Sequence, residues 1–153
     1  MNHGLKIIVH RGRHEIGGSC VELLYNGSRI IIDIGMPLVN ESGNKFDFKD
    51  YRNLSGQELV HRKILPDVSG FYLWDTDQKA IDGLLLSHAH LDHYGLIHYV
   101  RTDITCYLGQ GTKRIIDITR TFLGSPIDIQ NYSYLESGKT FHVGAFEVTP
   151  YLM

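Results

Sequence analysis

The sequence predicts a mixed α/β layered fold, and three observations support this prediction. Apolar runs of strand length alternate with segments of helical spacing. The pair Asn26-Gly27 separates two of these runs, and such a pair supports the positive φ angles of a tight hairpin turn. The run Ile30-Ile31-Ile32 is typical of a buried strand. We therefore expect early antiparallel pairing followed by strand–helix units, rather than a pure βαβ series.

The first half of the chain is expected to hold three strands and then a long connection. The strands are predicted at residues 5–10, 19–25 and 28–34, with a glycine-punctuated turn at 11–18. Apolar density falls between residues 36 and 79, which predicts a connection with one short helix near 55–62. Connections of this length are more often functional than idle. The segment Phe71–Trp74 inside it is expected to pin the connection to the core.

The second half is expected to alternate strands and helices and to end in a hairpin. The predicted strands are 81–87 and 104–108, the helices are 91–100 and 109–122, and the hairpin joins 135–143 to 146–153 at Gly144-Ala145. The longer helix carries an apolar stripe that should face the core. Its members are Ile115, Ile116, Ile118, Thr119 and Phe122.

Size and charge allow one domain and give no indication of the substrate. The chain has 153 residues, of which 42% are hydrophobic and 21% charged, as in an ordinary soluble domain. The net charge of -2 excludes a general basic field. Five cations are scattered, and the last three are expected on the solvent side of a helix: Arg11, Arg13, Lys113, Arg114 and Arg120.

The N-terminus has neither the apolar core nor the cleavage site of a signal peptide, and no apolar run is long enough to cross a bilayer. We therefore expect a cytoplasmic protein without membrane contact. Cys20 and Cys106 lie inside apolar runs without metal-type spacing, which predicts reduced core residues.

The segment Ser87–His93 carries the chemistry of the chain. It places three imidazoles and one carboxylate directly after an apolar strand. Residues two apart in an extended segment point the same way, so His88 and His90 can reach one metal ion. Asp92 and His93 come where the chain turns into a helix, which suits a second ion. These donors bind zinc and also tolerate manganese or iron.

Simpler explanations exist for single members of this set. Asp92 would also favour the N-terminal end of the helix that follows it. His142 sits in the predicted hairpin, where strand alternation alone explains it.

The Ser87–His93 segment resembles the signature motif of the metallo-β-lactamase superfamily. Asp33, at the end of the Ile30–Ile34 run, is similar to the aspartate that precedes this motif in the superfamily. The resemblance implies the N-terminal half of an αββα sandwich and two zinc ions, with manganese as an alternative. In the superfamily's pattern Asp33 orients the metal-site loop, while a solvated aspartate at a strand end is the simpler alternative.

The segments Glu15–Cys20 and His93–Ile97 resemble the ribonuclease J and β-CASP branch, whose members hydrolyse RNA or DNA phosphodiesters. That resemblance implies a water activated by metal. His88 and His90 would hold one ion, and Asp92 and His93 the other. Asp92 would also steer or accept a proton as a catalytic residue, and His14 and Glu15 could line the mouth of the site.

The chain departs from the superfamily's pattern after this first motif. A further histidine, a bridging aspartate and a final histidine have no recognisable counterpart, so we expect residues 1–153 to form a domain truncated at its C-terminal end. Half a sandwich would leave a sheet face uncovered, which invites self-association. A thioester or lactone hydrolase and a non-catalytic metal-binding fragment remain the alternatives to a nuclease.

Overall fold

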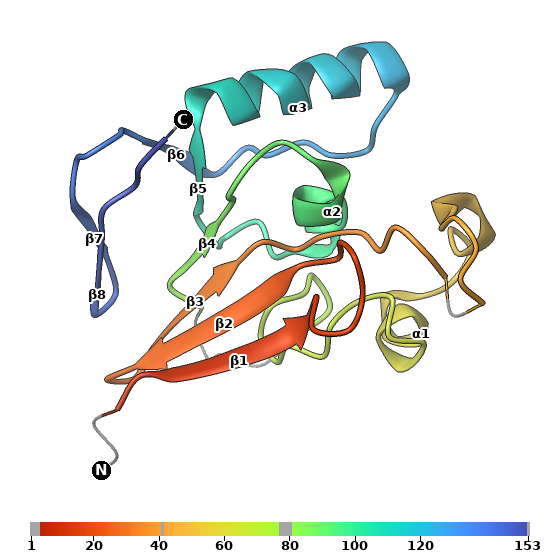
Figure 1. The fold of residues 1–153 in the computed structure, drawn as a ribbon, viewed down its shortest axis with the longest axis horizontal. Coiled ribbons are helices and arrows are strands. Elements are labelled where there is room, and N and C mark those ends of the chain that lie inside the picture. Colours follow the sequence, from red (N-terminus) through yellow and green to blue (C-terminus); the bar gives the residue numbers. More distant parts are fainter. Residues whose placement is uncertain (1–3, 41, 77–80, 153) are drawn as a thin grey trace.

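A computed structural model describes residues 4–40, 42–76 and 81–152. Its main element is a six-stranded sheet with the order β1-β2-β3-β4-β5-β6 (Figure 1). The strands are β1 (Lys6–Arg11), β2 (Cys20–Tyr25), β3 (Ser28–Ile32), β4 (Gly83–Leu85), β5 (Cys106–Gly109) and β6 (Tyr132–Leu135). The first three strands pair antiparallel, and β3 to β6 pair parallel. The predicted mixed α/β fold with early antiparallel pairing is confirmed.

The predicted turn between β2 and β3 is also confirmed. Asn26 and Gly27 have φ angles of 47° and 84°, and Tyr25 pairs directly with Ser28. The strand that follows ends sooner than residue 34, because Asp33 leaves the extended conformation at a φ of 62°. This left-handed residue aims its side chain at the neighbouring strand end.

The described helices are short except for one. They are α1 (Gly56–His61), α2 (Leu91–Tyr94) and α3 (Gln110–Leu123), with 3-10 turns η1 (Phe48–Asp50) and η2 (Ile97–Tyr99). The helix expected near 55–62 is α1, and a reciprocal capping box between Ser55 and Glu58 fixes its start. Within the described ranges, no helix combines the length and apolar character needed to cross a membrane.

The single helix expected at 91–100 is wrong in extent. The chain leaves α2 at Gly95 and resumes as the separate turn η2. Leu96 explains the break, because its N–H donates to the carbonyl of Ile34, two residues after β3, and its side chain is fully buried. A hydrogen bond to the segment after β3 therefore replaces the next helical turn.

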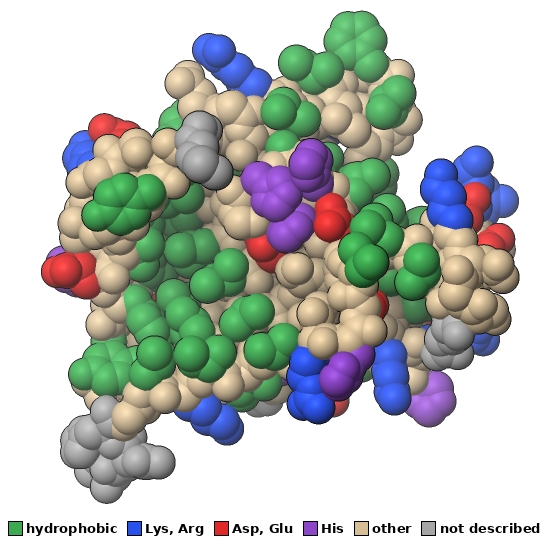
Figure 2. Space-filling model, viewed as in Figure 1, with side chains coloured by type: hydrophobic (Ala, Val, Ile, Leu, Met, Phe, Trp, Pro, Cys, Tyr) green, Lys and Arg blue, Asp and Glu red, His purple; other side chains and the backbone are tan. Residues whose placement is uncertain are grey.

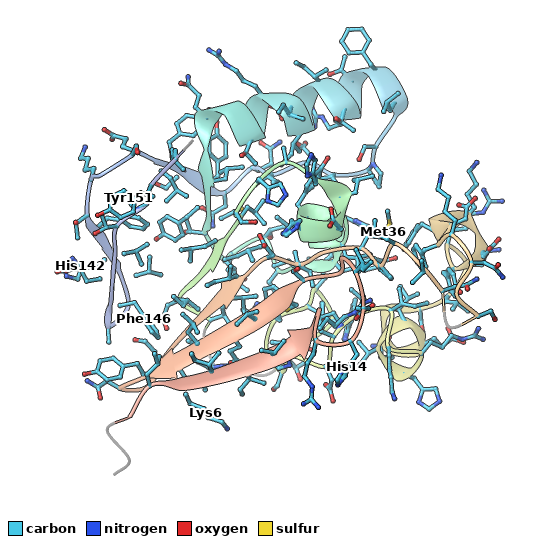
Figure 3. The ribbon with its side chains drawn as sticks, viewed as in Figure 1. Lys6, His14, Met36, His142, Phe146 and Tyr151 are labelled. Carbon is cyan, nitrogen blue, oxygen red and sulfur yellow. The ribbon has the colours of Figure 1, made fainter. Side chains whose placement is uncertain are left out.

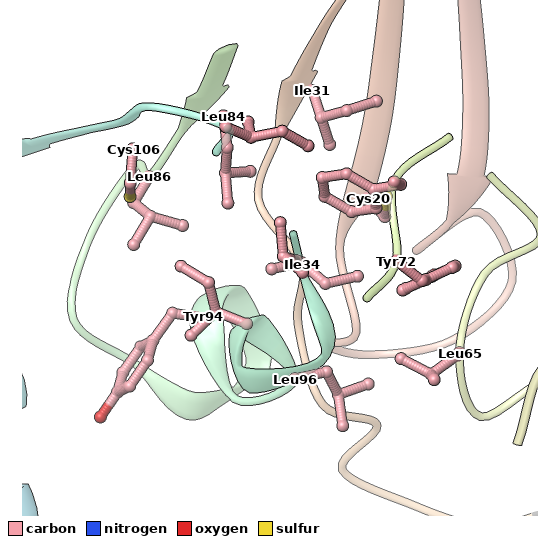
Figure 4. Close-up of a cluster of buried hydrophobic side chains, with 14 of the residues drawn as sticks. Cys20, Ile31, Ile34, Leu65, Tyr72, Leu84, Leu86, Tyr94, Leu96 and Cys106 are labelled. Carbon is pink, nitrogen blue, oxygen red and sulfur yellow. The ribbon is translucent and has the colours of Figure 1, made fainter. Parts of the chain in front are cut away.

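One face of the sheet carries the hydrophobic core, which Figure 4 shows in close-up. Ile31, Leu84 and Leu108 project from the strands into a layer formed by the helices and by the 36–76 connection. Phe71 and Tyr72 are buried there and Trp74 packs against them, so these residues pin the connection to the core as predicted, whereas Leu73 of the same segment is exposed.

The two cysteines lie in the same core layer. Cys20 and Cys106 are buried and free, as expected, and burial raises the pKa of each thiol to about 12. Neither thiol is therefore reactive near neutral pH.

The opposite face of the sheet is apolar and only partly covered. A two-stranded sheet, β7 (Phe141–Val143) and β8 (Phe146–Val148), packs over one end of it. The hairpin turns where predicted, whereas Leu135 belongs instead to β6, an edge strand that the sequence interpretation missed. Figure 2 shows hydrophobic side chains exposed across this face beside the hairpin. The predicted ends of the long connection (77–79) and of the hairpin (153) lie outside the described residues.

The apolar stripe expected on α3 is largely wrong. Ile116 is buried, but Ile115, Ile118 and Phe122 are exposed, because the helix lies over the β5 and β6 end of the sheet and only one line of it reaches the core. Lys113, expected on the solvent side, is buried: its Nζ binds both carboxylate oxygens of Asp117 at 2.7 Å and lies over the Tyr132 ring.

Candidate metal centre

Three imidazoles meet at the corner between β4 and α2. The ring centroids of His88 and His90 are 4.7 Å apart, and those of His88 and His93 are 3.9 Å apart. A central patch of histidine with an acidic side chain beside it is visible on the face shown in Figure 2. The structure thus brings together the three histidines that the sequence singled out.

Asp33 supports this corner from below. Its carboxylate accepts hydrogen bonds from the Ser87 N–H and the Ser87 hydroxyl, both at 2.8 Å, and from His93 Nδ1 at 2.7 Å. Only 4% of Asp33 is exposed. Since a carboxylate only accepts, His93 carries a proton on Nδ1, and its Nε2 faces the Asp92 carboxylate instead.

Ser87 links Asp33 to His88 and so fixes the tautomer of His88 as well. The Ser87 hydroxyl proton goes to Asp33, so His88 Nδ1 is the donor in its 3.0 Å contact with Ser87 Oγ. Burial lowers the pKa of His88, and the neighbouring rings of His93 and His90 lower it further. The neutral imidazole with a free Nε2 is the form that can bind a metal ion.

Asp92 is the carboxylate of the corner. Its Oδ2 lies 3.5 Å from His93 Nε2, and its backbone carbonyl accepts from the Ser19 N–H at 3.1 Å. Gly35 makes this placement possible, because a Cβ at that position would overlap the Asp92 carbonyl. The first turn, β3 and α2 therefore meet at Asp92. The sequence analysis assigned no role to Gly35, because its need for a small side chain depends on Asp92, which is distant in the sequence.

The side chains of this corner are of the types that bind zinc, but they do not converge on a single point. Three imidazoles and one carboxylate are donors that zinc takes. Nevertheless, across residues 4–40, 42–76 and 81–152 no group of three or more His, Cys, Asp or Glu side chains is arranged so that it could hold a metal ion. The packed rings account for this: the His88 and His93 rings lie against each other, with centroids 3.9 Å apart and planes tilted by 48°, instead of converging on one point.

The other candidate residues lie elsewhere. His14 and Glu15 are in the turn after β1, where they line a separate pocket: His14 contacts Arg13, and Glu15 pairs with Arg11. His142 is exposed on β7 beside Glu147, away from the corner (Figure 3).

The sequence of this chain is similar to the sequences of known ribonucleases. Ribonuclease J of Methanocaldococcus jannaschii is 32% identical over 101 residues, which cover 61% of this chain and 20% of that protein. RNase aCSPSF2 of Saccharolobus solfataricus is 30% identical over 146 residues, 92% of this chain and 24% of that protein. This chain therefore spans between a fifth and a quarter of the length of these curated relatives. No protein-family profile matches it.

A solved structure shares the fold. The crystal structure of a protein of unknown function from Enterococcus faecalis V583 superposes with a TM-score of 0.65 at 23% identity, over 92% of this chain and 36% of that chain. At this identity the likeness concerns the fold alone.

A layered sheet that delivers a His-x-His-x-Asp-His corner onto a buried aspartate defines a metallo-β-lactamase-type protein. Within that class the chain is similar to the ribonuclease J branch and matches the N-terminal part of it, so the resemblance stated from the sequence is confirmed.

Proposed function

We propose that this chain supplies the first part of a metal-dependent hydrolase that cleaves phosphodiester bonds in RNA or DNA. The observation that carries the proposal is the set of imidazoles at the β4–α2 corner, two of which Asp33 orients: His93 directly and His88 through Ser87. The names of the relatives, ribonuclease J and RNase aCSPSF2, favour a nucleic acid as the substrate. The two free, buried cysteines favour a reducing cytoplasm.

In this proposal His88 and His90 hold one metal ion, and Asp92 and His93 contribute to a second. A bound zinc or manganese ion would lower the pKa of a water molecule and polarise the scissile group. The chain's own residues prepare for this. Asp33 fixes the His93 tautomer, Ser87 fixes that of His88, and Asp92 is close enough to His93 Nε2 to hold a proton or a water there.

Metal content is the first test. We expect the purified chain to bind about one zinc ion or more, since one site needs about four donors with water included. His88→Ala/His90→Ala should lose that zinc, whereas His14→Ala/His142→Ala, which removes two exposed histidines, should keep it. Elemental analysis after exhaustive dialysis measures both. Zinc retained by the corner variant would overturn the proposal.

Hydrolysis of a labelled single-stranded RNA then separates an enzyme from a metal-binding module. Cleavage that requires zinc and disappears in the corner variant supports the nuclease. Zinc binding without cleavage of RNA, DNA, a thioester or a lactone would mean that the chain binds metal but does not catalyse. Cleavage of the thioester or lactone alone would reassign the substrate.

A further inference from the structure

The pocket that His14 and Glu15 line, of about 750 Å³, lies between the turn after β1, the connection after β3 and the end of α1. None of the corner histidines lines it. It is nevertheless adjacent to the corner through the turn they share. His14 contributes to the pocket, while a Cβ at Gly17 of the same turn would lie 2.8 Å from the Asp92 Cβ. Figure 3 shows His14 in this turn, beside α1.

The lining of this pocket has an excess of positive charge. Arg11, Arg62 and Lys63 line it together with one described carboxylate, that of Glu15. Glu15 is already bound by Arg11, through Nη2 at 2.7 Å and Nε at 3.2 Å. Within the described part of the chain, no carboxylate lies within ion-pair distance of Arg62 or Lys63, and both are exposed. The Arg62 charge does act on Glu58, whose pKa is lowered by hydrogen bonds from Ser55 and, to a smaller extent, by Arg62. Two exposed cationic side chains without a direct ion pair therefore line the pocket.

The backbone at Lys63 strengthens this interpretation. Lys63 follows the end of α1 at a φ of 57°, a left-handed conformation at a position where helices favour glycine. A lysine there costs free energy that a glycine would not. Attraction between cations and the end of a helix explains some positive charge at this place, but it does not require a lysine at the strained position itself.

Arg11 holds the pocket open without a ligand. It is buried, and its Nη1 donates to the Ile64 carbonyl at 2.5 Å while its other nitrogens hold Glu15. Gly18 leaves room for this, since a Cβ there would lie 2.8 Å from Arg11 Nη2. The guanidinium thus ties the turn after β1 to the end of α1, so the two walls are fixed in advance.

An aromatic wall stands beside the cations. Tyr51 lines the pocket and stacks on Phe46, which also lines it, with ring centroids 5.0 Å apart and planes 9° apart. Aromatic side chains next to free cations are the combination with which proteins hold single-stranded nucleic acids, through stacked bases and paired phosphates.

We propose that this pocket binds the backbone of a single-stranded nucleic acid beside the β4–α2 corner, with Arg62 and Lys63 on its phosphates and Tyr51 against a base. The identity of the ligand rests on the proposed function, whereas the cationic pocket does not. The pocket would then position the strand that the corner is proposed to cleave.

Binding of a fluorescently labelled single-stranded RNA, followed by anisotropy in a chelating buffer over a salt series, tests the proposal without any cleavage. Arg62→Gln/Lys63→Gln should weaken binding by about tenfold. It should also reduce the slope of the logarithm of the binding constant against the logarithm of the salt concentration by about 1.4, since each phosphate contact contributes about 0.7 to that slope. Lys6→Gln/Arg114→Gln removes the same charge from exposed residues that do not line the pocket, and should change neither quantity.

Two more variants separate lost charge from lost fold. Arg62→Lys/Lys63→Arg exchanges the cations and should retain binding. Lys63→Gly should raise the denaturation midpoint and still weaken RNA binding, because it relieves the left-handed backbone while removing a cation. Equal affinity and equal salt dependence in the wild type and Arg62→Gln/Lys63→Gln would overturn the proposal. So would a mononucleotide that binds as tightly as the oligonucleotide, which would indicate a site for small anions.

The corner variant His88→Ala/His90→Ala distinguishes a failure of the proposed hydrolase from a failure of the proposed nucleic-acid pocket. It should bind RNA like the wild type in chelator. If it retains zinc, the proposed hydrolase fails while a pocket-dependent loss of RNA binding still stands. If Arg62→Gln/Lys63→Gln binds RNA normally while the corner loses zinc as expected, only the pocket proposal fails.

Discussion

Asp33 combines an unfavourable backbone with a set of contacts that no other residue type would make. It is a non-glycine residue at a φ of 62°, and aspartate tolerates this region better than most residues. Its carboxylate is buried and satisfies three donors from Ser87 and His93. The energy of those hydrogen bonds offsets the backbone strain, so position and conformation support each other.

Substitutions at Asp33 should therefore cost stability for two separable reasons. We expect Asp33→Ala to lower the free energy of unfolding by about 2–4 kcal/mol, because it leaves buried donors unsatisfied and keeps a Cβ at positive φ. Asp33→Gly should cost about 1 kcal/mol less, since it removes only the hydrogen bonds. Urea unfolding measures both. If the two variants were equally stable, the backbone at Asp33 would not be strained.

A second buried polar group, formed by Glu22, Arg29 and His10, lies within the first sheet. The Glu22 carboxylate contacts Arg29 Nε at 2.5 Å and His10 Nε2 at 2.8 Å, and its side chain is 4% exposed. The contacts with Arg29 and His10 outweigh burial and lower the pKa of Glu22 from its ordinary value of 4.5. Folding therefore favours the ionised carboxylate.

We expect Glu22→Gln to lower the free energy of unfolding by about 3–5 kcal/mol near neutral pH, because it leaves the Arg29 charge buried without a partner. Glu136→Gln breaks an exposed pair with Lys139 and should cost no more than about 1 kcal/mol. The stabilisation from Glu22 is complete above about pH 4.5 and is lost as the pH falls through the lower folded pKa. Denaturant unfolding at several pH values should show that the difference in free energy of unfolding between the wild type and Glu22→Gln becomes smaller in acid. A difference that stays constant with pH would contradict this account.

At the scale of elements, backbone contacts between β3, α2 and the first turn build the corner. The Ile34 N–H donates to the His93 carbonyl, and the Gly35 N–H donates to the Ser19 carbonyl. These bonds need close approach, which glycine alone allows at position 35. Two short loops are thus locked to the first turn of α2, although that helix has only four residues.

Gly35→Ala should consequently be among the most damaging small substitutions. Its Cβ would overlap the Asp92 carbonyl, so we expect a loss of about 3 kcal/mol or more in the free energy of unfolding and a weaker zinc site. Gly111→Ala in α3 is the matched control, since a Cβ there meets nothing within 4 Å. It should gain up to about 1 kcal/mol from helix propensity. Thermal unfolding compares the two, and a tolerated Gly35→Ala would show that the corner can move.

For the whole molecule, the two faces of the main sheet are unlike. One face packs under the helices, whereas the other exposes Leu5, Ile7 and Val9; among the described residues, β7 and β8 cover it at one end only. An apolar sheet face of this kind usually has a partner, such as further chain, another protein or a second copy. β1 is also an edge strand, which adds unpaired backbone groups to the same region.

We therefore expect the 153-residue chain to self-associate through this face. Its average mass in sedimentation equilibrium should rise with concentration, and Ile7→Thr/Val9→Thr should shift it toward the monomer. Ile118→Thr/Phe122→Thr removes exposed apolar side chains from α3 instead and should have little effect. A wild type that stays monomeric at every concentration would refute this expectation.

The sequence alone determined whatever depends on neighbouring residues. The Asn26-Gly27 turn, the Ser55 start of α1 and the alternation of strands depend on local geometry and periodicity, which can be read from a short window. The histidine corner followed for the same reason, because its members lie within six residues. The type of fold and the candidate site were therefore predictable.

Only the tertiary structure decided features that join distant parts of the chain. The end of α2 depends on the bond from Leu96 to Ile34, the exposed side of α3 depends on where the sheet stops, and β6 forms only beside β5. The cationic pocket likewise gathers residues from three separate segments. Such contacts depend on how elements stack in space, and no local pattern of residue types carries that information.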